Sequence, residues 1–334
     1  MAATELLVLS RMREKSPLRF PRDLREARRR LVVLRTSTAV TPIGPIEYVD
    51  RGTGFPLLLV HGIFGGHDAA LRLTTPQVLA RYRAVAPSRF GYLGTPMPPH
   101  ADVPMQADAH AALLDTLGVE KAIVYAASAG STSALQLAIR HPDRVAGLVL
   151  QSANVPGPHH ERPVLPAAVA GVLWRSETLM WLVRTYLSAF IVDSMMGVPS
   201  GLTLSEADLA RLEVELDAIF PVRERIEGIM FDAYVGNREI NNHYRFESIT
   251  APTLLVHFRD DGGPPYDGAV RLARAIPGAR LLTGDHGGHL GLGEHPEIAA
   301  GIEEFLRDVS IKASPGTQSV VKTGLKGSAP GADQ

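Results

Sequence analysis

The sequence predicts an α/β fold in which helices flank a mostly parallel sheet. Short runs rich in apolar and β-branched residues alternate with stretches whose apolar residues recur every three or four positions, as strands alternating with helices do. The strand-like runs are apolar without interruption, which indicates burial on both faces. With 334 residues the chain can bury one large core, so one main domain with an insertion is the simplest organisation.

Six apolar runs are expected to be buried strands, and four amphipathic stretches are expected to be helices. The strands are residues 57–60, 84–86, 122–125, 148–150, 253–256 and 280–282, and the helices lie near 102–117, 129–140, 266–275 and 295–308. Because these elements fall into two blocks, we assign residues 36–151 and 250–311 to the sheet-containing core.

The alternation breaks once, over residues 152–249. This stretch contains helical patterns and no convincing strand. Met180 and Trp181 belong to one apolar helix face, and the capping pattern from Ser205 to Asp208 begins a later helix. We therefore predict a helical insertion over these residues.

The two ends of the chain differ in composition from the middle. Residues 1–35 carry ten Lys and Arg against four Asp and Glu and are predicted to form a basic helical extension. Such a run is most often a solvated helix face, although it also suits a partner chain or peripheral contact with an anionic membrane surface. Residues 312–334 are rich in Gly, Ser, Pro and Thr and are predicted to be a disordered tail.

Charge and cysteine content exclude several classes of protein. The 34 Lys and Arg nearly balance 35 Asp and Glu, which argues against a nucleic-acid partner. The chain has no cysteine, so disulfides, a thiolate nucleophile and Cys-ligated metals are excluded. No apolar run is long enough to span a bilayer, and the first residues lack a signal-peptide pattern. We expect a cytoplasmic protein that acts on a small molecule; its oligomeric state is open.

Ser128 occupies a position suited to a nucleophile. It lies between a strand-like run and a helix-like run, with the small residues Ala126, Gly130 and Ser131 around it. A sharp strand-to-helix turn strains the backbone, and larger side chains would collide with the neighbouring strand and helix. The same turn directs the amide of Ala129 toward the reaction centre. Taken alone, the pattern also fits a serine that caps a helix.

Residues 45–310 resemble the α/β-hydrolase superfamily, specifically a serine hydrolase with a helical cap. The turn Ala126-x-Ser128-x-Gly130 is similar to the family's G-x-S-x-G pattern, with Ala in place of the first Gly. The run 57–62, which ends in His-Gly, is similar to the family's strand followed by His-Gly, and the loop 87–95 resembles its P-D-x-x-G-x-G-x-S loop. In that loop Ser88 and Leu93 replace the usual Asp and second Gly.

The resemblance implies an α/β-hydrolase fold with a helical cap inserted after the sixth strand. It also implies a catalytic order of serine, acid and histidine. Asp261 matches the acid position, with Asp260 as the alternative, and His289 matches the base in preference to His286. No metal or organic cofactor is required.

A serine hydrolase also needs donors for the oxyanion, and the resemblance assigns this role to the backbone amides of Ile63 and Ala129, with Phe64 a weaker candidate. Four aromatic side chains are predicted to contact substrate: Phe64, Phe90, Trp174 and Trp181. A crevice lined by such residues favours apolar or aromatic groups over a sugar or phosphate.

The function predicted first is hydrolysis of a carboxylic ester or lactone through an acyl-enzyme intermediate. Carbon–carbon bond hydrolysis of a diketone-like substrate uses the same machinery and is the alternative. A cofactor-free acyltransferase or lyase, and a non-catalytic ligand-binding relative, complete the alternatives.

Overall fold

The sheet that the sequence predicts is present in the computed structural model, which describes residues 17–161, 165–199, 201–242 and 244–314. Eight strands form it in the order β1-β2-β4-β3-β5-β6-β7-β8. Their bounds are β1 Ser37–Thr41, β2 Gly44–Arg51, β3 Pro56–Val60, β4 Arg83–Pro87, β5 Ala122–Ala127, β6 Val145–Gln151, β7 Thr253–Phe258 and β8 Arg280–Gly284. β2 pairs antiparallel with β1 and β4, and the remaining pairs are parallel.

The six predicted strands correspond to β3 through β8, whereas the hairpin of β1 and β2 was not predicted. Those two strands lie at the edge of the sheet, and exposed residues interrupt their buried positions. They therefore lack the continuous apolar run by which the buried parallel strands are recognised.

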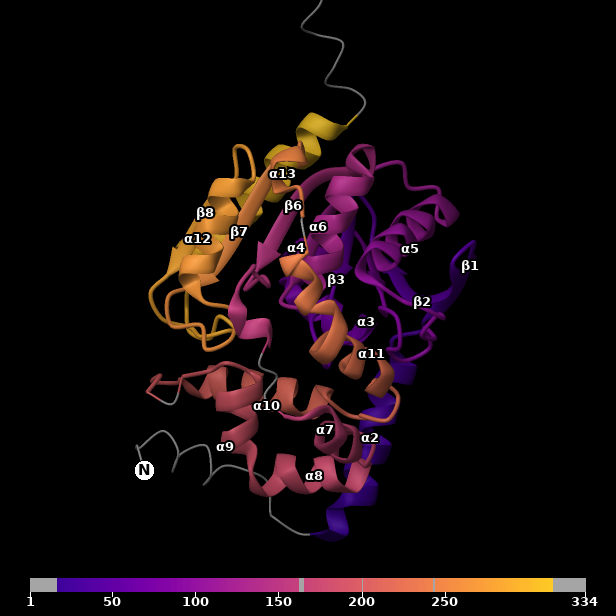
Figure 1. Cartoon of the computed structure of the whole chain (residues 1–334), viewed down its shortest axis with the longest axis vertical. Coiled ribbons are helices and arrows are strands. Elements are labelled where there is room, and N and C mark those ends of the chain that lie inside the picture. The colour runs from indigo at the N-terminus through magenta and orange to yellow at the C-terminus, as the bar shows by residue number, and fades with distance from the viewer. Residues whose placement is uncertain (1–16, 162–164, 200, 243, 315–334) are drawn as a thin grey trace, which may run out of the picture.

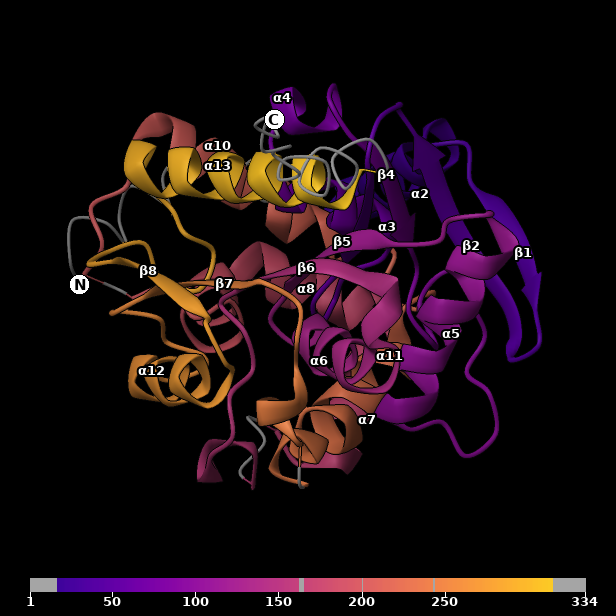
Figure 2. The same ribbon diagram turned by 90° about the horizontal axis from the view of Figure 1, so that it is seen from above.

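Helices cover both faces of the sheet (Figure 2). On one face pack α5 Val103–Thr116, α6 Gly130–Arg140 and α12 Tyr266–Ala275, and on the other α3 His67–Ala70, α4 Pro76–Leu79 and α13 Pro296–Ala313. Each face has its own cluster of buried apolar side chains, as a sheet buried on both sides requires. Short 3-10 turns η2 Leu71–Leu73 and η3 Pro142–Arg144 connect these elements.

The segment between β6 and β7 forms a helical layer, here called the cap, at one end of the sheet (Figure 1). Its helices are α7 Ala167–Trp174, α8 Glu177–Tyr186, α9 Ser188–Phe190, α10 Glu206–Ala218 and α11 Ile226–Phe231. Shorter turns are η4 Pro158–Glu161, η5 Ile191–Met195, η6 Asp232–Gly236, η7 Arg238–Asn241 and η8 Phe246–Ser248. The cap has a separate apolar cluster and covers the carboxyl ends of the core strands.

The basic N-terminal segment contributes a helix that packs on this cap. After η1 Pro17–Arg19, α2 Phe20–Val33 places the Phe20 ring 5.8 Å from the ring of Trp181, whose Nε1 donates to Asp23 at 3.1 Å. Arg30 donates to the carbonyl of Asp217 at 2.6 Å. One face of this helix is therefore a packing surface rather than a solvated one.

Parts of both predicted terminal segments, residues 1–16 and 315–334, lie outside the described residues. The predicted tail begins too early, because α13 continues through Ala313 and so includes Lys312. Within the described ranges no helix has the length and apolar character needed to cross a membrane.

Candidate active site

Ser128 lies immediately after β5 in a left-handed backbone conformation, with φ of 48°. A non-glycine residue pays roughly 1–3 kcal/mol for such a conformation, so the surrounding structure must hold it. The Ser128 amide donates to the carbonyl of Gln151 at 3.1 Å, and the Ser131 hydroxyl donates to the carbonyl of Ser128 at 2.6 Å. A Cβ at Gly130 would lie 2.4 Å from the carbonyl oxygen of His61. The small residue two positions after Ser128 is thus required by packing.

The structure places His289 against Asp261. Its Nδ1 lies 3.0 Å from both carboxylate oxygens of Asp261, and the acid side chain has no exposed surface. The amide of Gly263 donates to the same carboxylate at 2.8 Å, and Nε2 of the buried His257 lies 3.5 Å from it. With Nδ1 donating to Asp261, Nε2 of His289 is left to accept a proton.

The contacts move both pKa values in the direction that favours an ion pair. Burial would raise the pKa of Asp261, but the positive charge and hydrogen bond of His289 outweigh it and hold this pKa below its ordinary value. Burial would lower the pKa of His289, but the Asp261 charge and hydrogen bond outweigh it and raise this pKa above 6.5.

The alternative acid has a different environment. Asp260 accepts hydrogen bonds from the amides of Gly288 at 2.9 Å and Gly287 at 3.2 Å. His286 lies 3.6 Å from Asp260, and its side chain is 80% exposed. Asp260 therefore holds the backbone of the loop that carries His289. Among the described residues, no hydrogen bond joins Asp260 to His289.

His61 supports the loop after β3. Its Nδ1 lies 2.8 Å from the carbonyl of Gly62, and its Nε2 accepts a hydrogen bond from the Arg89 amide at 3.0 Å. These partners require the proton to be on Nδ1. Burial, and after it the charge of Arg89, put the pKa of His61 well below 6.5, so this side chain stays neutral.

The two amides predicted to bind the oxyanion belong to residues that follow two different strands, β3 and β5. Ile63 follows the end of β3 and lines the cavity described below, and the buried Ala129 is the N-cap of α6. Phe64, the weaker candidate, lines the same cavity. The oxyanion role of Ile63 and Ala129 stays a prediction.

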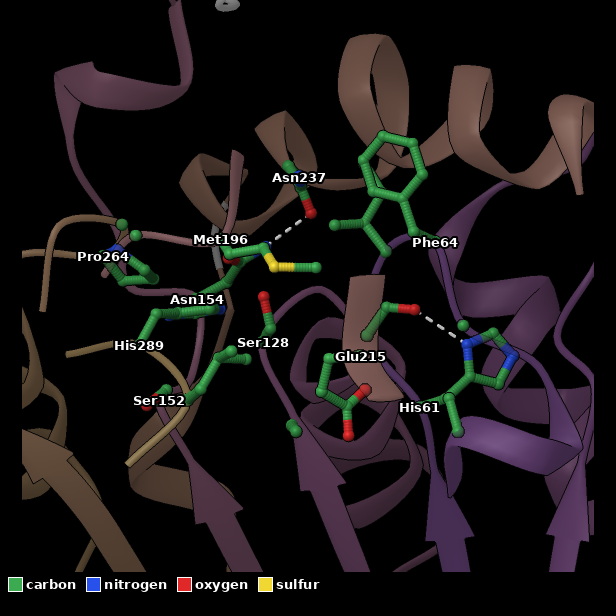
Figure 3. A pocket seen from close by; sticks show the side chains of 18 of the residues that line it. His61, Phe64, Ser128, Ser152, Asn154, Met196, Glu215, Asn237, Pro264 and His289 are labelled. Atoms are coloured by element: carbon green, nitrogen blue, oxygen red, sulfur yellow. Dashed lines mark hydrogen bonds between the residues drawn. The ribbon is translucent and has the colours of Figure 1, made fainter. Parts of the chain in front are cut away.

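A cavity of about 480 Å³ lies between the core and the cap and includes Ser128 and His289 in its wall. Figure 3 shows Ser128 below Met196 and Phe64 in this space. Most of the surface of this cavity is apolar, and the apolar side chains that form it include Ile63, Phe64, Leu73, Leu165, Trp174, Ile191, Met196, Ile219 and Leu290.

Two of the four predicted substrate contacts line this cavity and two do not. Phe64 and Trp174 do, with ring centroids 5.6 Å apart in an edge-to-face arrangement. Phe90 is buried in the cluster on one face of the sheet, and Trp181 packs on α2, so neither ring lines this cavity. Both rings are buried by packing against other parts of the protein.

The cap also contacts the loops that carry Asp261 and His289. The carbonyl of Gly197, just after η5, accepts hydrogen bonds from the amides of Gly262 at 3.1 Å and His289 at 3.0 Å. Arg211 on α10 donates to the carbonyls of Leu290 and Gly291 at 2.7 and 3.0 Å. Sequence patterns gave no signal for these contacts, because each joins segments far apart in the chain.

Comparison with known proteins agrees with this architecture. The family model described as the alpha/beta hydrolase fold matches residues 56–296. The chain belongs to the α/β-hydrolase family. Among solved structures, this hydrolase resembles an alpha/beta hydrolase fold protein from Nakamurella multipartita, with a TM-score of 0.64 and 27% identity over 82% of this chain and 99% of that one.

The curated relatives that match this hydrolase are themselves named as hydrolases. It is 29% identical to a 2-hydroxymuconate semialdehyde hydrolase from Pseudomonas sp. (strain CF600), over 79% of this chain and 91% of the relative. It is also 29% identical to a 2-hydroxy-6-oxononadienedioate/2-hydroxy-6-oxononatrienedioate hydrolase from Paraburkholderia phymatum, where the match spans 55% of this chain and 62% of that protein. A structure titled for Est816 as an N-acyl homoserine lactone degrading enzyme has a TM-score of 0.58 and 25% identity, over 79% of this chain and 96% of that one.

Proposed function

We propose that this hydrolase cleaves a carbon–carbon bond next to a ketone carbonyl, in a diketone-like substrate, with Ser128, His289 and Asp261 as its catalytic residues. The observation that carries the proposal is that His289, which lies 3.0 Å from the buried Asp261, lines the same cavity as a serine with strained backbone. The similarity to 2-hydroxymuconate semialdehyde hydrolase supports the choice of bond.

The reaction begins when Nε2 of His289 takes the proton of the Ser128 hydroxyl and the oxygen attacks the ketone carbon. The amides of Ile63 and Ala129 donate to the oxyanion that forms. Collapse of this intermediate breaks the carbon–carbon bond, and the departing carbon keeps the electron pair as an enolate of the second carbonyl. Protonation of that enolate by His289 releases the first product, a ketone.

An ester of Ser128 with the acyl fragment remains. Water, deprotonated by His289, attacks this ester, and expulsion of the Ser128 oxygen releases a carboxylic acid. Asp261 keeps the proton of His289 on Nδ1 and stabilises the imidazolium in both halves of the reaction.

Ester or lactone hydrolysis is the second candidate, because the same steps apply with an alkoxide as leaving group. The apolar cavity lining and the similarity to the enzyme described as degrading N-acyl homoserine lactones favour it. A non-catalytic ligand-binding role would require neither the buried acid nor its contact with His289.

The test begins with a fluorophosphonate probe, which labels an activated serine. Labelling of the wild type and its loss in Ser128→Ala are expected. Ser152→Ala is the matched control, since Ser152 also follows a strand, lines the same cavity and has a positive φ of 44°. A folded wild type that stays unlabelled, or a Ser128→Ala protein that labels fully, would rule out the mechanism.

The bond is then assigned with two substrates. Loss of the enol absorbance of 1-phenylbutane-1,3-dione, an uncharged diketone, is expected for carbon–carbon hydrolysis and should depend on Ser128. p-Nitrophenyl butyrate tests ester hydrolysis. Turnover of the ester alone would replace the first candidate by the second.

A further inference from the structure

An ion pair between the core and the cap forms part of the cavity wall. Arg72 in η2 donates through Nε and Nη2 to the two oxygens of Glu215 in α10, both at 3.0 Å. Both residues line the same cavity as Ser128, and Figure 3 shows Glu215 among the lining side chains. This side-on, bidentate arrangement is the one by which arginine binds a free carboxylate.

The charges around Arg72 balance. Arg72 also donates to the carbonyl of Asp68 at 2.9 Å, but the Asp68 carboxylate is bound by Arg225 at 3.0 and 3.1 Å. Arg225 is fully buried. Two guanidinium groups thus face two carboxylates, and Glu215 is the acid that occupies the bidentate edge of Arg72.

The direction in which the pKa of Arg72 is shifted agrees with this pairing. Burial would lower its pKa, yet the hydrogen bond and charge of Glu215 outweigh burial and raise that pKa. The other lining arginine, Arg211, is exposed and directs two donors to backbone carbonyls of the His289 loop. Among the described residues that line the cavity, Arg72 is therefore the arginine best suited to bind a substrate carboxylate, and Glu215 already occupies its two donors.

We propose that this wall selects an uncharged substrate group, and that Glu215 is the specificity-determining residue because it occupies the guanidinium of Arg72 and repels an incoming anion. The inference rests on the proposed function only in taking this cavity as the substrate site. Removing the charge of Glu215 converts the same wall into a carboxylate site, because Arg72 then lacks its bidentate partner.

Two ketones of equal chain length test the proposal by binding alone. 2-Heptanone and 6-oxoheptanoate share the carbonyl and differ at the far end, where a methyl group is replaced by a carboxylate. Neither has a stabilised carbon leaving group, so titration calorimetry on the intact protein measures affinity without turnover. The wild type is expected to bind 2-heptanone at least about tenfold more tightly.

Glu215→Gln is expected to reverse this preference, since the amide keeps the shape of Glu215 without its charge. Glu213→Gln, on the same helix but outside the cavity lining, is the matched control and should leave the ratio unchanged. The double variant Arg72→Gln and Glu215→Gln should lose the gain for 6-oxoheptanoate. Unchanged thermal unfolding of each variant establishes that it is folded.

Equal affinity of the wild type for the two ketones, or no binding of either, would overturn the proposal. An unchanged ratio in Glu215→Gln would also overturn it. Tight binding of 6-oxoheptanoate by the double variant would overturn it too, because Arg211 would then be the anion site. Failure of the catalytic proposal is separate, because fluorophosphonate labelling reports Ser128 and the ketone ratio reports the cavity wall.

Discussion

The carbonyl oxygen of Gly197 accepts a hydrogen bond from the amide of His289 at 3.0 Å, although Gly197 belongs to the cap and His289 to a core loop. The proposed base is therefore held from two sides. Asp261 fixes its ring, and the cap fixes its backbone. Any substitution that shifts this part of the cap is expected to reach the catalytic step.

Gly197→Ala is expected to lower kcat by roughly 10- to 100-fold, because a misplacement of about 1 Å can cost that much. Gly197 has φ of +58°, and a Cβ there would lie 2.9 Å from the Cβ of His289 and from the amide nitrogen of Gly263. Gly201→Ala is the control, since a Cβ there meets no atom within 4 Å. Steady-state kinetics measure both, and equal kcat values for the two variants would contradict the prediction.

The two neighbouring acids are expected to respond differently to the same change. Asp261→Asn should reduce kcat by about 10³- to 10⁴-fold, because an amide at this position favours the wrong tautomer of His289. Asp260→Asn should cost far less, since Asp260 contacts loop amides. A larger loss in Asp260→Asn would move the acid to that residue.

The pH profile should carry the signature of the raised His289 pKa. His289 accepts a proton only when neutral, so kcat/KM is expected to fall as pH is lowered through a pKa above 6.5. In Asp261→Asn the charge that raises this pKa is gone while burial remains, so the acid limb should move to lower pH. A limb that stays in place or moves upward would show that another group controls it.

A buried ion pair should dominate the stability of the contact between core and cap. Arg89, after β4, donates to Asp232 in η6, and Tyr92 donates to the same carboxylate at 2.6 Å. Asp232→Ala leaves the buried Arg89 without a counter-charge and should cost about 3–5 kcal/mol of unfolding free energy. The partly exposed pair of Arg83 and Asp50 is the comparison, where Asp50→Ala should cost about 1 kcal/mol or less. Urea unfolding measures both, and similar losses would refute the distinction.

The features that depend only on residues close together in the chain were the most predictable from the sequence. The turn at Ser128 needs small residues within three positions of the serine, and the parallel strands are continuous apolar runs, so both leave a pattern in the chain. The resemblance matched Asp261 to the acid position and kept Asp260 as the alternative. What the sequence could not predict is that Asp260 accepts hydrogen bonds from loop amides while Asp261 contacts His289.

Features that depend on long-range packing left no such pattern. Trp174 and Trp181 both belong to apolar helix faces of the cap, yet one lines the cavity and the other covers α2. Arg72 and Glu215 are separated by 143 positions, and each alone resembles an ordinary surface charge. Only the docking of the cap onto the core assigns these residues to the site.

The placement of the two tryptophans gives the protein a pair of built-in optical reporters. Trp174 and Trp181 are the only tryptophans in the chain, so each single Trp→Phe variant isolates the emission of the other. Emission from Trp174 should respond when a ligand displaces water from the cavity. Emission from Trp181 should respond instead when α2 separates from the cap. The two signals would therefore distinguish ligand binding in the cavity from a loss of packing between α2 and the cap.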